Sequence, residues 1–381
     1  MTANKKLLLM TNSVAMGGME EHVRLLAKEI DRSRFTVHTA VPDWPATEEF
    51  HRSMVTASDS VTLLAPDRRY GLVRQLRDAF GLWGLARRER FDAVHLHSTT
   101  YRGFSVAILA LRSAGVRGIV MTEHLAPEAP VSAKSRRIRG LTTRLIRTLV
   151  CVSENNRQSR ERYLGVAPCT TVVVDNGIDV DKFEPQPEPD ELDALRSDLG
   201  IAPGAPVVGT AIRLEPDKGV DDLVDAFALL RPDHPDAVLL VVGDGSLRAD
   251  LEHRASTAGL DGAVRFVGFQ TDPSLHIRLM DVFVLPVPFG SASIGLLEAM
   301  AMQRACIITF GGDLEAVQHG DSGFCARPND PTSIAEFAGR LLDDDALRAS
   351  IERAAGDRVR AHYSADRVAR QLMDIYDEVQ R

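Results

Sequence analysis

The chain of 381 residues is too long for one ordinary hydrophobic core, so it predicts two domains that each bury an interior of their own. Hydrophobic residues make up 44% and charged residues 26%, which is typical of soluble globular proteins, and no apolar run approaches the ~20 residues of a membrane-spanning helix. This argues against an integral membrane protein. Four cysteines without metal-ligand spacing favour a reducing, cytoplasmic location.

Charge is divided unevenly along the chain. Residues 1–175 hold 26 Lys and Arg against 17 Asp and Glu, whereas the remainder holds 19 against 36, and the net charge is −8. We expect the basic half to face an anionic partner. Nucleic acid is not expected, because the full chain is acidic and no nucleic-acid-binding motif accompanies the basic segments.

Strand and helix signals alternate along both halves of the chain, which predicts parallel sheets covered by helices. The strand-like segments of the first half are residues 6–13, 35–41, 61–65, 93–98, 118–124, 149–154 and 170–177. Those of the second half are residues 206–214, 237–245, 264–269, 282–287, 305–310 and 323–328. We therefore expect an α/β protein built from two Rossmann-like, doubly wound domains that face a central cleft, where the carboxyl ends of such sheets bind ligands.

The domain boundaries follow from composition. Residues 179–206 are rich in Pro and acidic residues, which is typical of a linker. The sequence thus predicts one domain over residues 1–178 and a second over residues 207–361. A closing helix is expected at about residues 362–381, where apolar residues recur at helical spacing.

Two motifs at the ends of predicted strands suit an anionic ligand. Gly17 and Gly18 follow the first strand, where glycines let the backbone approach a phosphate or sugar, although they also suit a plain tight turn. Arg213 and Lys218 follow the first strand of the second half, where two cations can converge on a diphosphate or can simply be solvated.

Residues 288–300 predict the end of a buried strand, a loop of small residues and the start of a helix. The loop and the helix start suit an anion, whereas Glu298, one turn inside the helix, would repel a bound phosphate. The ligand must therefore suit both an anion-binding loop and a nearby carboxylate.

These motifs occur in one order along the chain: the Gly-Gly-x-Glu loop, then "TEH", "VSE", "DNGIDVDKF", "RLEPDKG", "VVGDG", "VRFVGF" and "LLEAMA". That order resembles glycosyltransferase family 4, retaining enzymes of the two-domain GT-B fold, over residues 5–380. The resemblance implies an acceptor-binding N-terminal domain and a C-terminal domain that binds a nucleotide-sugar donor, with a UDP-sugar as first choice and a GDP-sugar as the alternative.

The resemblance also implies roles for single residues. Arg213 and Lys218 would hold the diphosphate, and the Gly17–Gly18 loop would close over the donor. His124 matches a histidine near the transferred sugar, although a purely structural histidine is the alternative. Glu298 matches the second acid of the family's Glu-x7-Glu motif and would accept hydrogen bonds from the ribose.

The donor pocket departs from the family pattern. The first acid of the motif would stand at position 290, where this sequence has Gly290, and Ser293 replaces an expected glycine among the donor-binding residues. The change at position 290 is consistent with an active enzyme that uses a different donor sugar. The alternative is a non-catalytic glycosyltransferase-like subunit that supports a partner enzyme.

The family resemblance implies retaining transfer without a metal or another cofactor, in which the departing diphosphate accepts the proton of the acceptor hydroxyl. Arg213 and Lys218 would then stabilise the charge that develops on the leaving group. The Asp run at residues 343–345 is interpreted as solvated turn acids and not as a metal site.

Two basic segments of the first half suit a membrane surface. Residues 132–150 contain six Lys and Arg and no acid, with Ile138, Leu141, Leu145 and Leu149 at helical spacing, and they predict a basic amphipathic helix. Residues 72–90 repeat the pattern with Phe80 and Trp83. A core-packed helix with a solvated basic face is the alternative. We expect a glycan, a lipid-linked molecule or a small molecule as acceptor, and a peripheral position on the inner face of the membrane.

Overall fold

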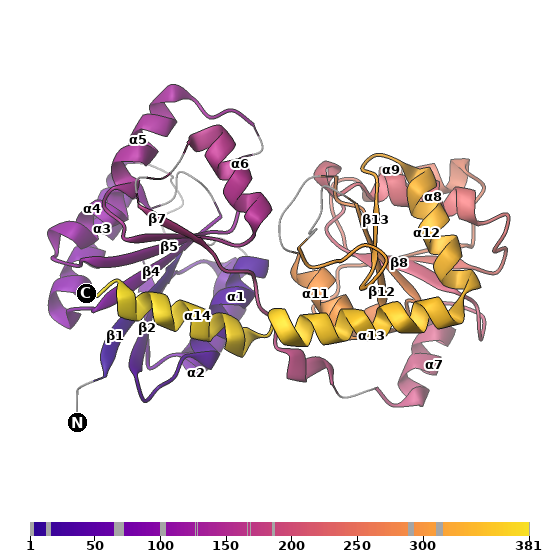
Figure 1. The fold of residues 1–381 in the computed structure, drawn as a ribbon, viewed down its shortest axis with the longest axis horizontal. Coiled ribbons are helices and arrows are strands. Elements are labelled where there is room, and N and C mark those ends of the chain that lie inside the picture. The colour runs from indigo at the N-terminus through magenta and orange to yellow at the C-terminus, as the bar shows by residue number, and fades with distance from the viewer. Residues whose placement is uncertain are drawn as a thin grey trace. The chain divides into compact units, whose positions relative to one another are not determined.

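The structure is a computed structural model that describes residues 4–12, 17–64, 72–99, 104–125, 127, 129–165, 167, 169–184, 187–288, 293–309 and 315–380. The chain forms two compact units (Figure 1). Unit 1 comprises Met1–Ile178 together with Ala365–Arg381, and unit 2 comprises Asp179–Ser364. The last helix of the chain thus belongs to the first unit.

Unit 1 contains a parallel sheet of seven strands in the order β3-β2-β1-β4-β5-β6-β7. The strands are β1 (Lys5–Thr11), β2 (Phe35–Pro42), β3 (Ser60–Leu64), β4 (Ala93–Ser98), β5 (Gly118–Glu123), β6 (Thr148–Cys151) and β7 (Thr170–Val173). The central strands are apolar on both faces, as expected for a sheet covered on both sides. In β1, Leu7 and Leu9 face one core layer, and Leu8 and Met10 face the other.

Helices cover both faces of this sheet (Figure 1). The Leu7 layer lies under α1 (Gly18–Glu29), α2 (Glu48–Ala57) and α14 (Ala365–Glu378), whereas the opposite layer lies under α3 (Leu72–Glu89) and α4 (Ser105–Ser113). Two more helices follow β5 and β6, namely α5 (Ala133–Thr143) and α6 (Glu154–Leu164), and a short 3-10 turn η1 (Pro45–Thr47) precedes α2.

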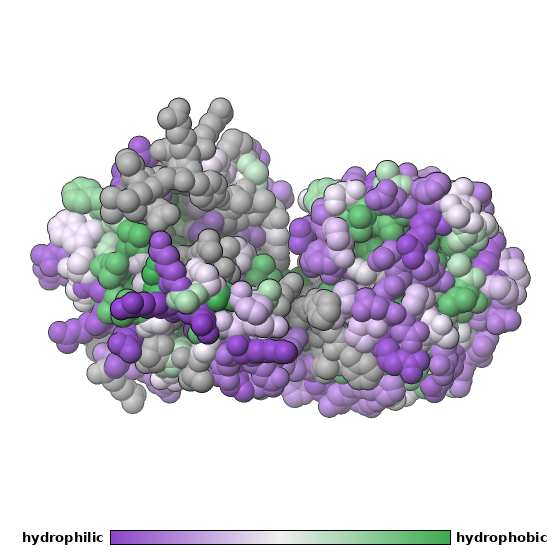
Figure 2. Space-filling model, turned by 90° about the horizontal axis from the view of Figure 1, so that it is seen from above, coloured by the Kyte–Doolittle hydropathy of each residue, from purple (hydrophilic) through white to green (hydrophobic). Residues whose placement is uncertain are grey.

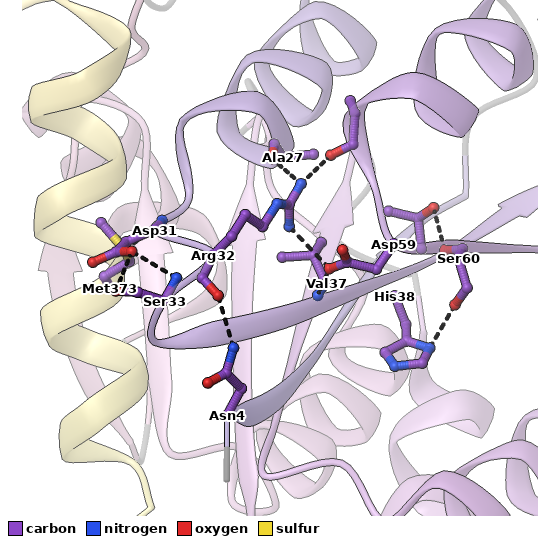
Figure 3. Close-up of polar contacts among 12 residues, drawn as sticks. Asn4, Ala27, Asp31, Arg32, Ser33, Val37, His38, Asp59, Ser60 and Met373 are labelled. Carbon is purple, nitrogen blue, oxygen red and sulfur yellow. Dashed lines mark hydrogen bonds and ion pairs between the residues drawn. The ribbon is translucent and has the colours of Figure 1, made fainter. Parts of the chain in front are cut away.

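Polar contacts connect the segments at the amino ends of strands β2 and β3 in unit 1 (Figure 3). Arg32, in the turn after α1, donates to the carbonyls of Ala27 and Ala57 and so ties the end of α1 to the end of α2. Asp59 accepts from the backbone N–H of Val37 at 2.7 Å. These contacts hold the edge of the sheet that lies away from the carboxyl ends of its strands.

The C-terminal helix α14 completes the core of unit 1. Its Tyr376 is fully buried and packs edge-on against Phe35. Asp377 accepts from Lys5 at 2.6 Å and from Arg34 at 2.5 Å. This helix corresponds to the closing helix predicted at about residues 362–381, and in the structure it spans Ala365–Glu378.

Unit 2 contains a parallel sheet of six strands in the order β10-β9-β8-β11-β12-β13. The strands are β8 (Val207–Ala211), β9 (Val238–Val242), β10 (Val264–Gly268), β11 (Val282–Leu285), β12 (Ala305–Thr309) and β13 (Phe324–Ala326). The helices are α7 (Pro189–Asp198), α8 (Val220–Leu230), α9 (Arg248–Thr257), α10 (Ser274–Arg278), α11 (Ile294–Ala301), α12 (Pro331–Asp343) and α13 (Asp345–His362), with 3-10 turns η2 (Val180–Phe183) and η3 (Pro216–Lys218).

The structure confirms the predicted fold class and each predicted strand. Residues 179–206, for which the composition suggests a linker, fall within unit 2 and hold η2 and α7. Within the described residues, no helix combines the length and the apolar character that crossing a membrane requires.

The prediction of one amphipathic helix over residues 132–150 is wrong. Helix α5 ends at Thr143, and Leu149 lies buried in β6, paired with β5 and β7. The Thr142 hydroxyl hydrogen-bonds to the Arg139 carbonyl, and the Thr143 hydroxyl donates to the same carbonyl at 2.8 Å. The Thr143 hydroxyl also donates at 3.3 Å to the carbonyl of Gly140, one of the last four of the helix, and the strand that follows takes its hydrogen bonds from the sheet.

Candidate active site

In unit 2, the loop after β8 carries Arg213. The backbone N–H of Ile212 donates at 2.9 Å to the carbonyl of Val242, which ends β9, and that of Leu214 donates at 3.0 Å to the carbonyl of Asp244 in the loop after β9, so that the residue between them is held at the strand end. The Arg213 side chain is exposed, and its guanidinium has no direct hydrogen bond or ion pair with the described residues, while Glu215 and Asp217 attract it at longer range. Its guanidinium is therefore available to an anionic ligand.

Two glycines allow the loops around Arg213 to pack against each other. Gly243 has a φ of 135°, and a Cβ there would lie 1.9 Å from the carbonyl oxygen of Ile212. Gly219 has a φ of 65°, and a Cβ there would lie 2.2 Å from the carbonyl oxygen of Pro286. Only glycine combines this backbone conformation with so close an approach. The motifs "VVGDG" and "RLEPDKG" thus bring the ends of β8, β9 and β11 together.

Lys218 ends the 3-10 turn η3, just before Gly219. Its Nζ lies 2.6 Å from Asp217 Oδ2, and 20% of the Lys218 side chain is exposed. Asp217 itself is more than half exposed. An incoming phosphate can therefore compete with this carboxylate for the ammonium group.

Helix α11 begins at the same edge of the sheet. A Cβ on Gly295 would lie 3.5 Å from the carbonyl oxygen of Ala211, which ends β8. Ser293 is the N-cap, and its hydroxyl oxygen accepts a hydrogen bond from the backbone N–H of Leu296 at 3.4 Å. The serine that replaces the expected glycine thus stabilises the start of the helix.

Glu298 lies one turn inside α11 and is half-buried. The structure therefore places Arg213, Lys218, Ser293 and Glu298 around the carboxyl ends of β8 and β11. Gly290, the other predicted determinant of this pocket, lies outside the described residues.

In unit 1, Gly17 and Gly18 form the start of α1. Gly17 is the N-cap in an extended conformation, and no side chain caps the helix. The first turn of α1 also contains Glu20 and Glu21, and Glu21 pairs with Arg24 at 2.5 Å. Both glycines lie where the sequence predicts, at the junction that follows β1.

His124 follows β5 and belongs to a group of buried histidines. Its backbone N–H donates to the carbonyl of Ser98 at 2.9 Å, which ties it to the end of β4. His97 Nδ1 and His124 Nε2 share a hydrogen bond of 3.2 Å. His22, from α1, lies with its ring centroid 5.0 Å from that of His124 and 5.5 Å from that of His97.

A fourth histidine, His95, is fully occupied by hydrogen bonds. Its Nδ1 lies 2.6 Å from the Tyr376 hydroxyl, and its Nε2 lies 2.7 Å from the Thr122 hydroxyl. The ring centroids of His95 and His97 are 3.9 Å apart, because residues two apart on a strand share a face.

Burial keeps these histidines uncharged. It lowers the pKa of His22 to about 4 and holds the pKa of His95, His97 and His124 well below the usual value, with repulsion between the rings as a smaller cause for those three. Near neutral pH, His124 is therefore a neutral hydrogen-bonding group and not a cation.

The residue before His124 anchors a buried ion cluster. Glu123 pairs with Arg139 of α5, and its second oxygen accepts from Arg160 of α6 at 3.1 Å. Arg139 is only 3% exposed. The end of β5 is thus fixed to two helices by charge, and removal of the carboxylate would leave two buried cations without compensation.

The sequence reasoning missed His22, His95, His97 and Glu123. The alternation in "AVHLHS" does place two histidines on one face of a strand. Their meeting with α1 and with the end of β5 depends on strand order, which separates these residues widely in sequence. The Asp run at residues 343–345 joins α12 to α13, and Asp344 is the N-cap of α13, which agrees with its interpretation as turn acids.

The helices on one face of the unit 1 sheet expose apolar side chains. Phe80 of α3 is 73% exposed and stacks on Trp83, while Ile138 and Leu141 of α5 are 45% and 55% exposed. Helix α4 contacts both α3 and α5 and exposes Leu109. Figure 2 looks from the side on which α5 lies in Figure 1, and unit 1 shows hydrophobic residues beside hydrophilic ones there.

Two family models match consecutive parts of the chain. The model described as Glycosyltransferase Family 4 matches residues 16–182, and the model described as Glycosyl transferases group 1 matches residues 205–344. The chain is 28% identical over 293 residues to the UDP-Gal:alpha-D-GlcNAc-diphosphoundecaprenol alpha-1,3-galactosyltransferase of Escherichia coli, across 74% of each chain. It is 30% identical over 192 residues to the N-acetyl-alpha-D-glucosaminyl L-malate synthase of Bacillus anthracis, across 50% of each chain.

A solved structure shows the same arrangement of elements. The Anabaena protein HepE in complex with UDP and glucose is 22% identical and superposes with a TM-score of 0.83 over 98% of this chain and 100% of that chain. Together with the two doubly wound sheets, this likeness defines the GT-B fold. The chain belongs to glycosyltransferase family 4 and is an enzyme that transfers sugars.

Proposed function

We propose that this enzyme transfers a sugar, with retention of configuration, from a nucleoside-diphosphate sugar to a hydroxyl group of a lipid-linked or cell-surface glycan. A UDP-sugar is our first choice of donor. The observation that carries the proposal is the exposed Arg213 beside Lys218 at the carboxyl end of β8, next to the start of α11.

The diphosphate would bind to these two cations, and the half-buried Glu298 would accept hydrogen bonds from the ribose. A carboxylate one turn inside the helix lies beyond the first N–H groups, so the phosphate can bind at the helix start while the ribose hydroxyls bind to the carboxylate. The relatives support a UDP-sugar: the E. coli protein is named as a UDP-Gal transferase, and HepE was solved with UDP and glucose.

The main role of the proposed site would be to stabilise the negative charge that develops on the departing diphosphate. Arg213 and Lys218 supply positive charge to the departing diphosphate, whose oxygen takes the proton of the acceptor hydroxyl, and the proposed step needs no metal. His124 would contact a sugar hydroxyl as a neutral group, and the backbone at Gly17 and Gly18 would approach the donor. The basic unit 1 would bind the acceptor.

We further propose that unit 1 rests on an anionic membrane through α3, α4 and α5. The exposed Phe80, Trp83, Ile138 and Leu141 would enter the headgroup region, and the exposed Lys134, Arg136, Arg137 and Arg144 of the α5 region would pair with anionic lipids. The E. coli relative, named for a diphosphoundecaprenol substrate, supports a lipid-linked acceptor.

The test is an assay of transfer and donor hydrolysis with a panel of UDP- and GDP-sugars and a cellular lipid extract. We expect turnover with at least one UDP-sugar and an α-linked product from an α-linked donor. Nucleotide binding without transfer or hydrolysis for any donor, with transfer restored by a competent partner enzyme, would instead support the non-catalytic subunit.

A further inference from the structure

Three buried histidines of unit 1 converge from elements that are far apart in sequence. His22 comes from α1, His97 from β4, and His124 from the residue after β5. Each can offer one ring nitrogen, and these three nitrogens all lie within 4.8 Å of one another. All three side chains belong to residues that are more than nine-tenths buried.

The separations are close to those of ligands around one metal ion. With Zn–N bonds of about 2.0–2.1 Å, two nitrogens of a tetrahedral site lie about 3.4 Å apart. His97 Nδ1 and His124 Nε2 are already 3.2 Å apart. The pair that is furthest apart would have to approach by at most about 1.4 Å, which small rotations of the rings can supply.

Two ring nitrogens in this cluster are buried without a hydrogen bond. Among the described residues, neither His22 Nε2 nor His97 Nε2 has a partner. A buried polar atom normally finds one, because its desolvation is otherwise uncompensated. His95, in contrast, directs both nitrogens at hydroxyl groups, so among these four rings the unpartnered nitrogens belong to His22 and His97. In His97 the unpartnered Nε2 is the nitrogen that does not face His124.

We propose that His22, His97 and His124 form a binding site for one divalent transition-metal ion, and that Zn²⁺ suits the site best. Three neutral imidazoles match the ligand preference of Zn²⁺ and leave a fourth position open for water. Mg²⁺ and Ca²⁺ are poor candidates because they prefer oxygen ligands. Cu²⁺ and Ni²⁺ share the preference for imidazole and serve as comparison ions.

The bound ion would oppose the proposed sugar transfer and take no part in it. It would occupy a ring nitrogen of His124, the side chain that we assign to a sugar hydroxyl, so ion and donor sugar would compete. This consequence rests on the proposed function, whereas binding of the ion does not. The phosphate-binding Arg213 and Lys218 belong to the other unit.

The test measures the ion directly and needs no donor. The full chain, stripped with a chelator, is titrated with Zn²⁺ by calorimetry and with Co²⁺ by visible absorption. We expect one ion per chain and the intense visible bands of four-coordinate Co²⁺. The absence of saturable binding, or the weak spectrum of Co²⁺ surrounded by oxygen ligands, would overturn the proposal on the wild-type protein alone.

Variants then locate the site. His22→Gln and His97→Gln each remove a ligand and should weaken Zn²⁺ binding by more than the roughly 10–100-fold that loss of an outer hydrogen bond costs a metal site. His38→Gln is the matched control, since His38 lies in β2 of the same sheet and hydrogen-bonds to Ser60. Equal Zn²⁺ affinity in His22→Gln and the control would refute the assignment. If a variant is unfolded by circular dichroism, X-ray absorption of the Zn²⁺-loaded wild type decides, and a site without three nitrogen ligands would refute it equally.

Discussion

At the residue scale, Arg213 and Lys218 differ in whether a carboxylate of this chain forms an ion pair with them. Lys218 is paired with Asp217, whereas Arg213 has no ion pair with the described residues. A diphosphate must therefore displace a carboxylate from contact with Lys218, whereas at Arg213 it meets only the longer-range attraction of Glu215 and Asp217. The two cations should contribute unequally to nucleotide binding.

We expect Arg213→Ala to weaken UDP binding by about 1.5–3 kcal/mol, the usual value of a hydrogen bond to a charged group, and Lys218→Ala to weaken it less. Isothermal calorimetry with UDP measures both. Arg353→Ala, which removes an exposed cation of α13 in the same unit, is the control and should bind as the wild type does. Unchanged affinity in the double variant would remove the diphosphate site from these residues.

Glu298 gives a second prediction at this scale. Glu298→Gln keeps the shape of the side chain but loses the charge of the acceptor, so the variant should bind UDP more weakly. Wild type should prefer UDP over its 2′-deoxy analogue, and the variant should lose most of that preference, because the missing hydroxyl and the changed acceptor share one contact. Equal binding of both nucleotides to the wild type would contradict the ribose role.

Gly290 concerns the choice of donor sugar. A carboxylate at this position would restore the family's first acid, so Gly290→Glu should raise turnover with an ordinary hexose donor relative to the donor that the wild type prefers. Hydrogen bonds gained or lost at a substrate hydroxyl can change specificity strongly. Ratios of kcat/KM across the donor panel measure the shift, and Gly290→Gln controls for the added bulk. An unchanged ratio with both variants would show that position 290 does not select the donor.

At the scale of elements, the sequence predicted the positions of the strands more accurately than the buried faces of the helices. Buried parallel strands are nearly continuous apolar runs bounded by turn residues, so each can be recognised locally. The buried face of α5 could not be recognised locally, because this helix buries the charged Arg139 against Glu123 and exposes the apolar Ile138 and Leu141. Arg139 is buried because its partner is Glu123, a carboxylate sixteen positions earlier in the chain, at the end of β5. The histidine cluster was missed for the same reason, because its residues lie far apart in sequence. Arg213 and Lys218, in contrast, could be selected from a local motif after β8.

The exposed face of α5 makes a prediction about membranes. Charge reversal of Arg136 and Arg137 should reduce binding to vesicles that contain anionic phosphatidylserine, since each cation near such a surface contributes ~1 kcal/mol. Ile138→Asp should also reduce it, because the side chain would no longer enter the headgroup region. Co-sedimentation with vesicles, with neutral phosphatidylcholine for comparison, measures both effects.

The control for the membrane experiment lies on the other face of the same sheet. Val55 of α2 is 65% exposed, and Val55→Asp should leave vesicle binding unchanged. Equal loss with Val55→Asp and Ile138→Asp would indicate non-specific adhesion and would contradict a docking face on α5.

At the scale of the whole molecule, unit 1 is built from both ends of the chain. Tyr376→Ala should destabilise this unit by an amount similar to the about 3–5 kcal/mol of large aromatic truncations, and it also leaves His95 Nδ1 without its hydroxyl partner. In a domain of this size, that corresponds to a loss of roughly 6–20 °C in melting temperature.

Differential scanning calorimetry with and without UDP tests the Tyr376 prediction, because UDP should stabilise unit 2 alone. We expect the transition of unit 1 to move and the UDP-sensitive transition to stay. Asp374→Ala, an exposed position on the same helix, should move neither transition. A Tyr376→Ala variant in which both transitions fall together would show that the two units do not unfold separately.

The position of α14 also determines the order in which the chain can fold as it is synthesised. Residues 4–178 leave the ribosome first, but the layer that packs on Leu7 and Leu9 is covered by α1 and α2 alone until Val368, Leu372 and Tyr376 have been made. Unit 2 is contained in one continuous segment and can complete its core before then. At about 5–20 residues per second, the earlier-made half therefore spends roughly ten to forty seconds with part of an apolar sheet face uncovered. The first unit to be translated is the last to be finished, and during that interval it is the part of the enzyme with most need of a chaperone.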